Sequence, residues 1–97
     1  MLEKSQIISF LRENIKLLRD KYGVVDIGLI GSYARDEQKE DSDIDFLVEF
    51  IEVKYDFLAD LTIFLEKRFG KKIDIVINDK YLKKSFLTTA NRNVIHV

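Results

Sequence analysis

The sequence predicts an α/β domain, built on a small mixed β-sheet with helices mainly on one face. Three short stretches rich in β-branched and aromatic residues alternate apolar with polar side chains, which is typical of half-buried strands. Two longer stretches repeat apolar residues at helical spacing. Each of these ends at a glycine, Gly23 or Gly70, the residue that most often terminates a helix.

Few residues that break helices or strands separate the elements, because the chain has no proline and only four glycines. We expect a helix over residues 3–22, a strand over 24–30, and a short helix over 32–38 with Ser32 as its N-cap. The later elements are expected as a strand over 43–50, a helix over 54–69, a strand over 72–78, a helix from 79 to about 90, and a short edge strand over 94–97.

The composition excludes several classes of protein. All 97 residues, 1–97, are expected to form one domain, because two cores in so short a chain would bury too little surface. The absence of cysteine excludes disulfides and thiolate catalysis, and the single histidine, His96, argues against histidine chemistry. No apolar run approaches the roughly 20 residues that span a bilayer, and the N-terminus has no signal-peptide pattern. A net charge of −1 disfavours direct nucleic-acid binding, so we expect a cytoplasmic domain whose chemistry rests on carboxylates.

Alternation along the strands sorts the side chains between the two faces of the expected sheet. In the first strand it predicts that Val25, Ile27 and Leu29 face the core, opposite Asp26 and Gly28. In the second and third strands, the residues expected on the polar face are mostly acidic: Asp43, Asp45, Glu49 and Asp74, together with Asn78. We therefore expect carboxylates to gather on a face that is partly open to water.

The strongest signal is a Gly-Ser pair, Gly31-Ser32, followed after ten residues by Asp43 and Asp45. A glycine between a strand and a helix lets the backbone approach a ligand, and free N–H groups at a helix start attract phosphate. Two carboxylates on one strand face repel each other when ionised, and a divalent cation removes that repulsion. Hard oxygen ligands of this kind suit magnesium or manganese.

A nucleotide that spans both motifs constrains the order of the strands. The end of the first strand must lie near the start of the second, so these two strands are expected to be antiparallel. The third strand follows a helical crossover and is expected to lie parallel to the second. Asp74 would then lie level with Asp43 and Asp45. Three carboxylates beside a phosphate-binding turn predict metal-assisted phosphoryl or nucleotidyl transfer.

This pattern resembles the minimal nucleotidyltransferases of the DNA polymerase β superfamily. Members of that superfamily carry a Gly-Ser motif, an Asp-x-Asp about ten residues later, and a third carboxylate on a following strand. The residues that match are Gly31-Ser32, Asp43 with Asp45, and Asp74, and the resemblance covers nearly the whole chain. Two segments are typical of the antitoxins of HEPN–MNT toxin–antitoxin pairs: Gly-Ser-Tyr-Ala-Arg and Ser-Asp-Ile-Asp-Phe-Leu-Val.

The resemblance implies an enzyme that moves AMP from ATP to a hydroxyl, most often a tyrosine, of a helical HEPN toxin encoded nearby. It implies that Asp43 and Asp45 hold two magnesium ions, and that Asp74 ligates the ion nearer the acceptor and takes its proton. Arg35 would contact either a phosphate or a neighbouring acid. The nucleotide-binding residues implied are Gly31, Ser32 and Arg35.

Two other functions stay open at this point. Nucleotidyl transfer to a small molecule usually needs an additional acceptor-binding domain, and the chain holds little beyond the expected catalytic core. An antitoxin that acts by binding alone is suggested by the acidic loop after Arg35, where the family often has glycine in place of Asp36. The acids of this loop are Asp36, Glu37, Glu40 and Asp41. Acceptor specificity is expected to come from a second protein or from a homo-oligomer.

Overall fold

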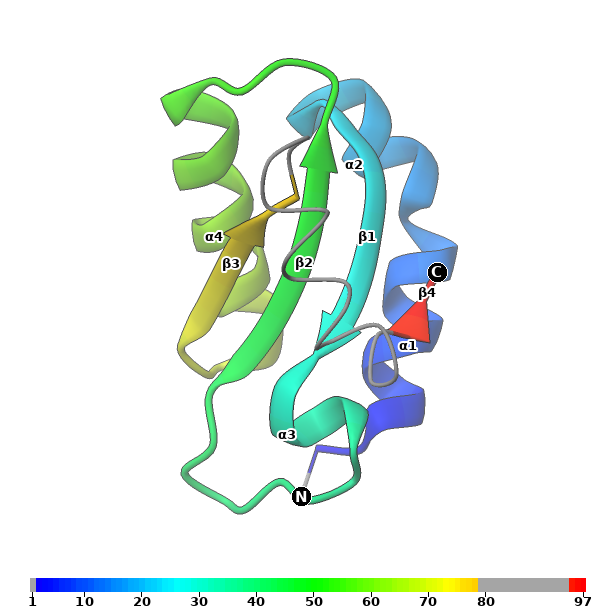
Figure 1. Ribbon diagram of the computed structural model, residues 1–97, viewed down its shortest axis with the longest axis vertical. Helices are drawn as coiled ribbons and strands as arrows, with labels where there is room; N and C mark the ends of the chain where they lie inside the picture. The colour runs from blue at the N-terminus through cyan, green and yellow to red at the C-terminus, as the bar shows by residue number, and fades with distance from the viewer. Residues whose placement is uncertain (1, 79–94) are drawn as a thin grey trace.

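The computed structural model describes residues 2–78 and 95–97, and its elements follow the predicted order (Figure 1). The helix predicted from residue 79 to about 90 lies outside the described residues. The two-residue β4 falls where the sequence predicts an edge strand. The elements are α1 (Lys4–Glu13), α2 (Ile15–Tyr22), β1 (Val24–Ile30), α3 (Gly31–Ala34), β2 (Ile44–Phe50), α4 (Tyr55–Phe69), β3 (Ile73–Ile77) and β4 (Ile95–His96).

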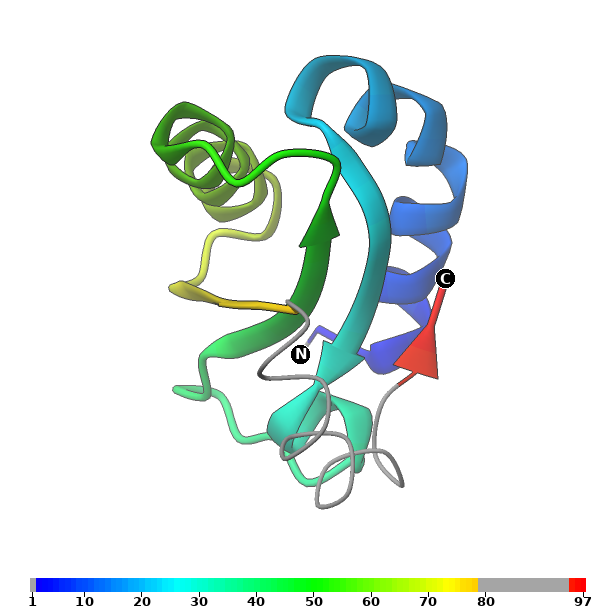
Figure 2. The same ribbon diagram turned by 45° about the horizontal axis from the view of Figure 1, so that its top comes forward.

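The sheet is mixed and has the strand order β3-β2-β1-β4. β1 pairs antiparallel with β2 and with β4, whereas β2 pairs parallel with β3. Figures 1 and 2 show α1, α2 and α4 on one side of the sheet, and α3 at the end of β1. The predicted fold class and the predicted directions of the first three strands are therefore confirmed.

The first predicted helix is interrupted at Asn14. Helical backbone ends at Glu13 and resumes at Ile15, and Asn14 itself has φ −111° and ψ 13°. The Asn14 side-chain amide donates a hydrogen bond to the Phe10 carbonyl at 2.9 Å. Asparagine competes for backbone partners in this way, so it favours helix ends over helix interiors. The expectation of one continuous helix over residues 3–22 is therefore wrong.

A β-bulge decides which side chains of β1 reach the core. The register with β2 shifts between Val24 and Asp26, so Val24 is only 2% exposed while Val25 is 43% exposed. An extra residue in one strand breaks the alternation of faces beyond it. The expectation that Val25 faces the core is therefore wrong, whereas Ile27 and Leu29 are fully buried as predicted.

The core fills the space between the sheet and the three longer helices. Its fully buried side chains come from every layer: Ile7, Leu11, Leu18, Ile27, Leu29, Tyr33, Ile44, Phe46, Val48, Leu61 and Leu65. Gly23 and Gly70 end α2 and α4 in the left-handed conformation, each with φ 66°, as predicted for both. Among residues 2–78 and 95–97, no helix is long and apolar enough to cross a membrane.

Candidate active site

Strand pairing brings the predicted acids to one end of the sheet. Asp45 on β2 lies in register with Asp74 on the parallel strand β3. On its other side, Asp45 lies in register with Ile30, the last residue of β1, so Gly31 follows directly beside it. Residues from three separate parts of the chain thus meet where β1 ends and β2 begins.

The Asp45 carboxylate occupies the space that a side chain at position 31 would need. A Cβ built at Gly31 would overlap Asp45 Oδ2. Gly31 also has φ 74°, in the left-handed region that other residues rarely adopt. Both constraints demand glycine here, and they place the Asp45 carboxylate against the backbone turn that leads into α3.

The electrostatics centre on Asp45, which is partly buried. Burial contributes most to raising the pKa of the Asp45 carboxyl above its usual range. The charges of Asp74 and Asp43, together with a hydrogen bond between the Asp45 and Asp74 side chains, raise the pKa further. The Arg35 guanidinium acts in the opposite direction. The Asp45 carboxyl therefore holds its proton more tightly than an isolated aspartate does when no cation is bound.

Asp43 lies one residue before β2 rather than on the strand, where the sequence placed it. Its Oδ2 is 3.9 Å from the Lys72 ammonium, at the far limit of an ion pair. The neighbouring Lys71 donates to the backbone carbonyl of Glu40. Both lysines therefore reach the loop that leads into β2.

The face that carries the acids is less open than the sequence predicts. Leu47 lies on this face between Asp45 and Glu49, yet it is only 3% exposed. Two surface hollows lie elsewhere: one of about 460 Å³ bordered by Tyr22 and Phe64, and one of about 410 Å³ bordered by Val25 and Ile51. The candidate site is thus an acidic edge of the sheet and not one of these hollows.

Ser32 occupies the first turn of α3 and is not its N-cap. Ile30 holds the N-cap position, two residues before the predicted Ser32, and Gly31, which has a positive φ, is the first residue of the helix. The helix covers only four residues, Gly31–Ala34, and not residues 32–38 as expected. A helix this short has a small dipole, so a phosphate here would depend on local N–H groups and on the Ser32 hydroxyl.

Three charged residues after α3, namely Arg35, Asp36 and Glu37, form ion pairs. Arg35 pairs with Glu37 at 3.2 Å, the acid-pairing alternative for this arginine, and Asp36 pairs with Lys4 at 3.0 Å. Two of the four acids in this loop are thus held by cations. Tyr33 is fully buried in the core, which agrees with a packing role.

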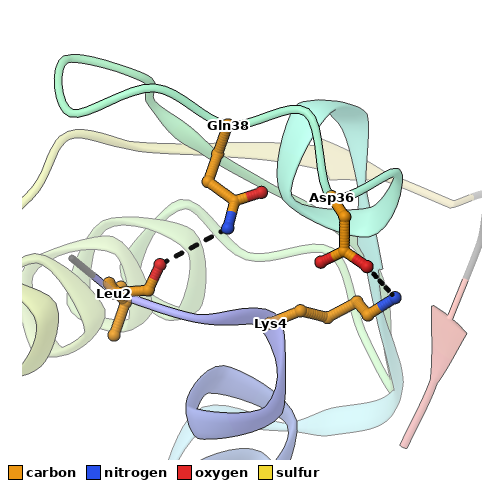
Figure 3. Close-up of polar contacts among 4 residues, drawn as sticks. All are labelled: Leu2, Lys4, Asp36 and Gln38. Atoms are coloured by element: carbon orange, nitrogen blue, oxygen red, sulfur yellow. Dashed lines mark hydrogen bonds and ion pairs between the residues drawn. The ribbon is translucent and has the colours of Figure 1, made fainter.

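Lys4 is the residue of this region that the sequence patterns do not indicate. It is separated from Asp36 by 32 positions, and an isolated Lys-Asp pair at that distance has no sequence signature. Gln38, which donates to the Leu2 carbonyl at 3.5 Å, joins the same two segments (Figure 3).

The donor chemistry of the site fits a hard divalent cation. Carboxylate oxygens of Asp43, Asp45 and Asp74 are the ligands that magnesium prefers, and burial, with the charges of Asp74 and Asp43, raises the pKa of Asp45. Within the described residues, no three such side chains already stand at ligand spacing. The acids would therefore have to reorient around an ion, and Asp43 would have to leave Lys72.

Comparison with known proteins places the chain in a family. Residues 11–95 match the family model of the nucleotidyltransferase domain, and the chain belongs to that family. It is a nucleotidyltransferase, as the motifs predict. The chain is 47% identical over 88 residues to “Putative protein adenylyltransferase MJ1379” of Methanocaldococcus jannaschii, a match that covers 84% of this chain and 88% of that protein. It is 40% identical to protein adenylyltransferase MntA of Thermococcus cleftensis, with 100% of this chain and 98% of that protein covered.

Solved structures agree with this assignment. A “putative minimal nucleotidyltransferase” is 32% identical, with a TM-score of 0.71 over 92% of this chain and 94% of that one. A toxin-antitoxin crystal structure with AMP-PNP is 26% identical, with a TM-score of 0.60 over 92% of this chain and 70% of that one. The resemblance to minimal nucleotidyltransferases is thereby confirmed.

Proposed function

We propose that this chain transfers AMP from ATP to a hydroxyl group of a partner toxin, and so acts as an antitoxin. The observation that carries the proposal is the position of Asp45, which lies between Asp74 and the side-chain-free turn at Gly31. The relatives named protein adenylyltransferase support transfer of AMP to a protein. The toxin-antitoxin structure with AMP-PNP supports a toxin partner and an adenine nucleotide.

In this reaction the acceptor oxygen attacks the α-phosphorus of ATP. A new oxygen–phosphorus bond forms while the bond to the bridging oxygen of the β-phosphate breaks, and pyrophosphate leaves. Asp74 takes the proton of the acceptor hydroxyl, because it is the most exposed of the three acids and so the most accessible from outside. The Gly31–Ser32 turn holds the triphosphate through its backbone N–H groups and the Ser32 hydroxyl.

Two magnesium ions would be held by Asp43, Asp45 and Asp74, and would neutralise charge on the attacking and leaving oxygens. Asp45 has to be deprotonated to act as a ligand, and its raised pKa means that a cation and a proton compete for this carboxylate. The acceptor, following the resemblance, is a tyrosine of a HEPN-type toxin.

The test is incubation with α-labelled ATP, magnesium and the protein encoded by the neighbouring gene. We expect label on that protein and a mass gain of whole AMP units. The double variant Asp43→Asn, Asp45→Asn is expected to transfer nothing while remaining folded, because neither side chain belongs to the hydrophobic core and each amide keeps the size of the carboxylate that it replaces.

The alternative function, which the test must distinguish from AMP transfer, is an antitoxin that acts by binding alone. Its supporting observation was the acidic loop, in which Asp36 and Glu37 are now paired with Lys4 and Arg35. If the double variant neutralises the toxin as well as the parent does, with no mass gain in either case, the protein acts by binding and the proposed activity is wrong.

A further inference from the structure

The short helix α3 ends in a turn that only a left-handed residue can close. The Glu37 N–H donates to the Ser32 carbonyl at 2.9 Å, and the Asp36 N–H donates to the Tyr33 carbonyl at 3.4 Å. This pair of hydrogen bonds is a Schellman motif, which normally has glycine at its left-handed position. Here that position is Asp36, with φ 57°, the one residue other than glycine with positive φ among those described.

The side chain that makes this conformation unfavourable also provides a contact that glycine would lack. Asp36 Oδ2 accepts a hydrogen bond from the Lys4 ammonium at 3.0 Å, and the two groups form an ion pair (Figure 3). The second link, from Gln38 Nε2 to the Leu2 carbonyl, is long at 3.5 Å, and Gln38 Oε1 is buried with no hydrogen-bond partner in the structure. The ion pair is therefore the stronger connection between the N-terminal segment and the turn.

Lys4 is poorly placed to stabilise its own helix. It is the first residue of α1, where the positive end of the helix dipole disfavours a cation. A carboxylate on Lys4 offsets this repulsion. The contact with Asp36 thus serves both segments, and α1 is anchored in the core through Ile7, Ile8 and Leu11. The ion pair therefore links the turn after α3 to a helix that is packed in the core.

We propose that Lys4 and Asp36 are positioning residues that fix the Gly31–Ser32 turn for nucleotide binding. The connection runs from the Lys4 ammonium to Asp36, then through the Glu37 N–H to the Ser32 carbonyl, next to Gly31 and the Asp45 carboxylate. This inference rests on the proposed function, because it concerns the binding of ATP at the same turn.

The experiment breaks the pair from each side. Asp36→Asn keeps the size of the side chain and the tolerance of asparagine for the left-handed conformation, and Lys4→Met keeps most of the aliphatic stem. Each variant is expected to raise the KM for ATP by about threefold to fivefold, the upper range for an exposed ion pair, with kcat unchanged. The double variant should lose no more than either single variant, since both remove the same contact. Lys4→Arg should retain the parent KM.

A second measurement does not depend on activity. Hydrogen exchange of the Glu37 amide, in protein free of nucleotide and magnesium, should become several times faster in Asp36→Asn and in Lys4→Met. The matched control is Lys54→Met, which removes the exposed ion pair between Lys54 and Glu52 (3.5 Å) at the other end of the sheet. It should change neither the exchange at Glu37 nor the KM for ATP.

The outcomes separate the two proposals. If the parent protein transfers no AMP, the proposed function fails, and the exchange rates together with calorimetric titration of magnesium-ATP still decide the positioning role. Unchanged exchange at Glu37 in both single variants, or additive losses of ATP affinity in the double variant, would overturn it. Faster exchange with weaker ATP binding in both singles, rescued in Lys4→Arg, would support it.

Discussion

Burial and neighbouring acids disfavour the charged form of the Asp45 carboxyl group as long as no cation is bound. Its burial and its acidic neighbours raise its pKa in the folded protein above 3.8, the ordinary value for aspartate, which applies in the unfolded chain. The folded state therefore binds the proton more tightly than the unfolded state does. At pH values above the folded pKa this group destabilises the metal-free protein, and the destabilisation disappears as the pH falls toward the unfolded pKa.

Asp45→Asn should therefore raise the melting temperature of the metal-free protein at neutral pH. The amide carries no charge and can still donate a hydrogen bond to Asp74, so the like-charge repulsion is removed. The difference between variant and parent should shrink as the pH is lowered from about 7 to about 4, and thermal melts in EDTA across that range measure it.

Asp41→Asn is the control for Asp45→Asn, because it removes one carboxylate from the exposed loop. It should leave the melting temperature within a degree or two at every pH, as expected for a surface substitution. A lower melting temperature in Asp45→Asn at pH 7 would mean that the carboxylate is structural, and the assignment of the site would fail.

Among the elements, the junction of β1 and α3 imposes a tight steric requirement on the sequence. At Gly31, a side chain would overlap Asp45 Oδ2 and would also have to adopt φ 74°. Gly70 offers a comparison within the same chain, because it has φ 66° but nothing within 4 Å of the position where a Cβ would lie. Both glycines have a positive φ, but of these two only Gly31 has another side chain, that of Asp45, where its own Cβ would lie.

Gly31→Ala and Gly70→Ala should accordingly have different effects. Each should cost about 1–2 kcal/mol of stability from the left-handed backbone alone, or several degrees in melting temperature. In the parent and in Gly70→Ala, ATP with magnesium should raise the melting temperature by mass action. In Gly31→Ala that rise should vanish, because Asp45 is displaced from the turn.

Differential scanning fluorimetry with and without ATP and magnesium measures these effects. Ser32→Ala should give an intermediate rise, since it removes a hydroxyl donor and leaves the backbone in place. A full ATP-induced rise in Gly31→Ala would show that the turn does not contact the nucleotide. An equal rise without magnesium would contradict cation-dependent binding.

For the molecule as a whole, the site lies on an edge of the sheet and away from the two surface hollows described above. Neither of these hollows is bordered by Asp74. A partner protein that docks at this edge would hold its hydroxyl in place. Holding two reactants in the right geometry can supply several kcal/mol of barrier reduction, on the order of 7 or more in well-oriented cases.

Transfer of AMP to the intact partner should therefore far exceed transfer to free tyrosine at the same concentration. Mass spectrometry of the partner and chromatography of the amino acid compare the two acceptors directly. Asp74→Asn should abolish both reactions, because it removes the group that takes the proton. Comparable rates for the partner and for free tyrosine would mean that docking contributes no orientation.

Sequence by itself determined the elements and the chemical character of this protein. Alternating apolar residues specified β2 and β3, helical spacing specified α4, and glycines at 23 and 70 specified where two helices end. The Gly-Ser and Asp-x-Asp motifs indicated nucleotidyl transfer, and the crossover rule indicated that Asp74 lies beside Asp45. These features depend on local spacing and on general rules of strand connection, which are visible in the order of residues.

Only the tertiary structure decided the features that depend on contacts between distant segments. The bulge that exposes Val25, the shift of the α3 start from Ser32 to Gly31, and the contact between Lys4 and Asp36 leave no local pattern. Each involves a contact between elements: Val25 lies where the register with β2 shifts, Gly31 lies against the Asp45 carboxylate of β2, and Asp36 pairs with Lys4 of α1. A sequence pattern records which residues are apolar or charged, but the packing of the folded chain sets which of them meet.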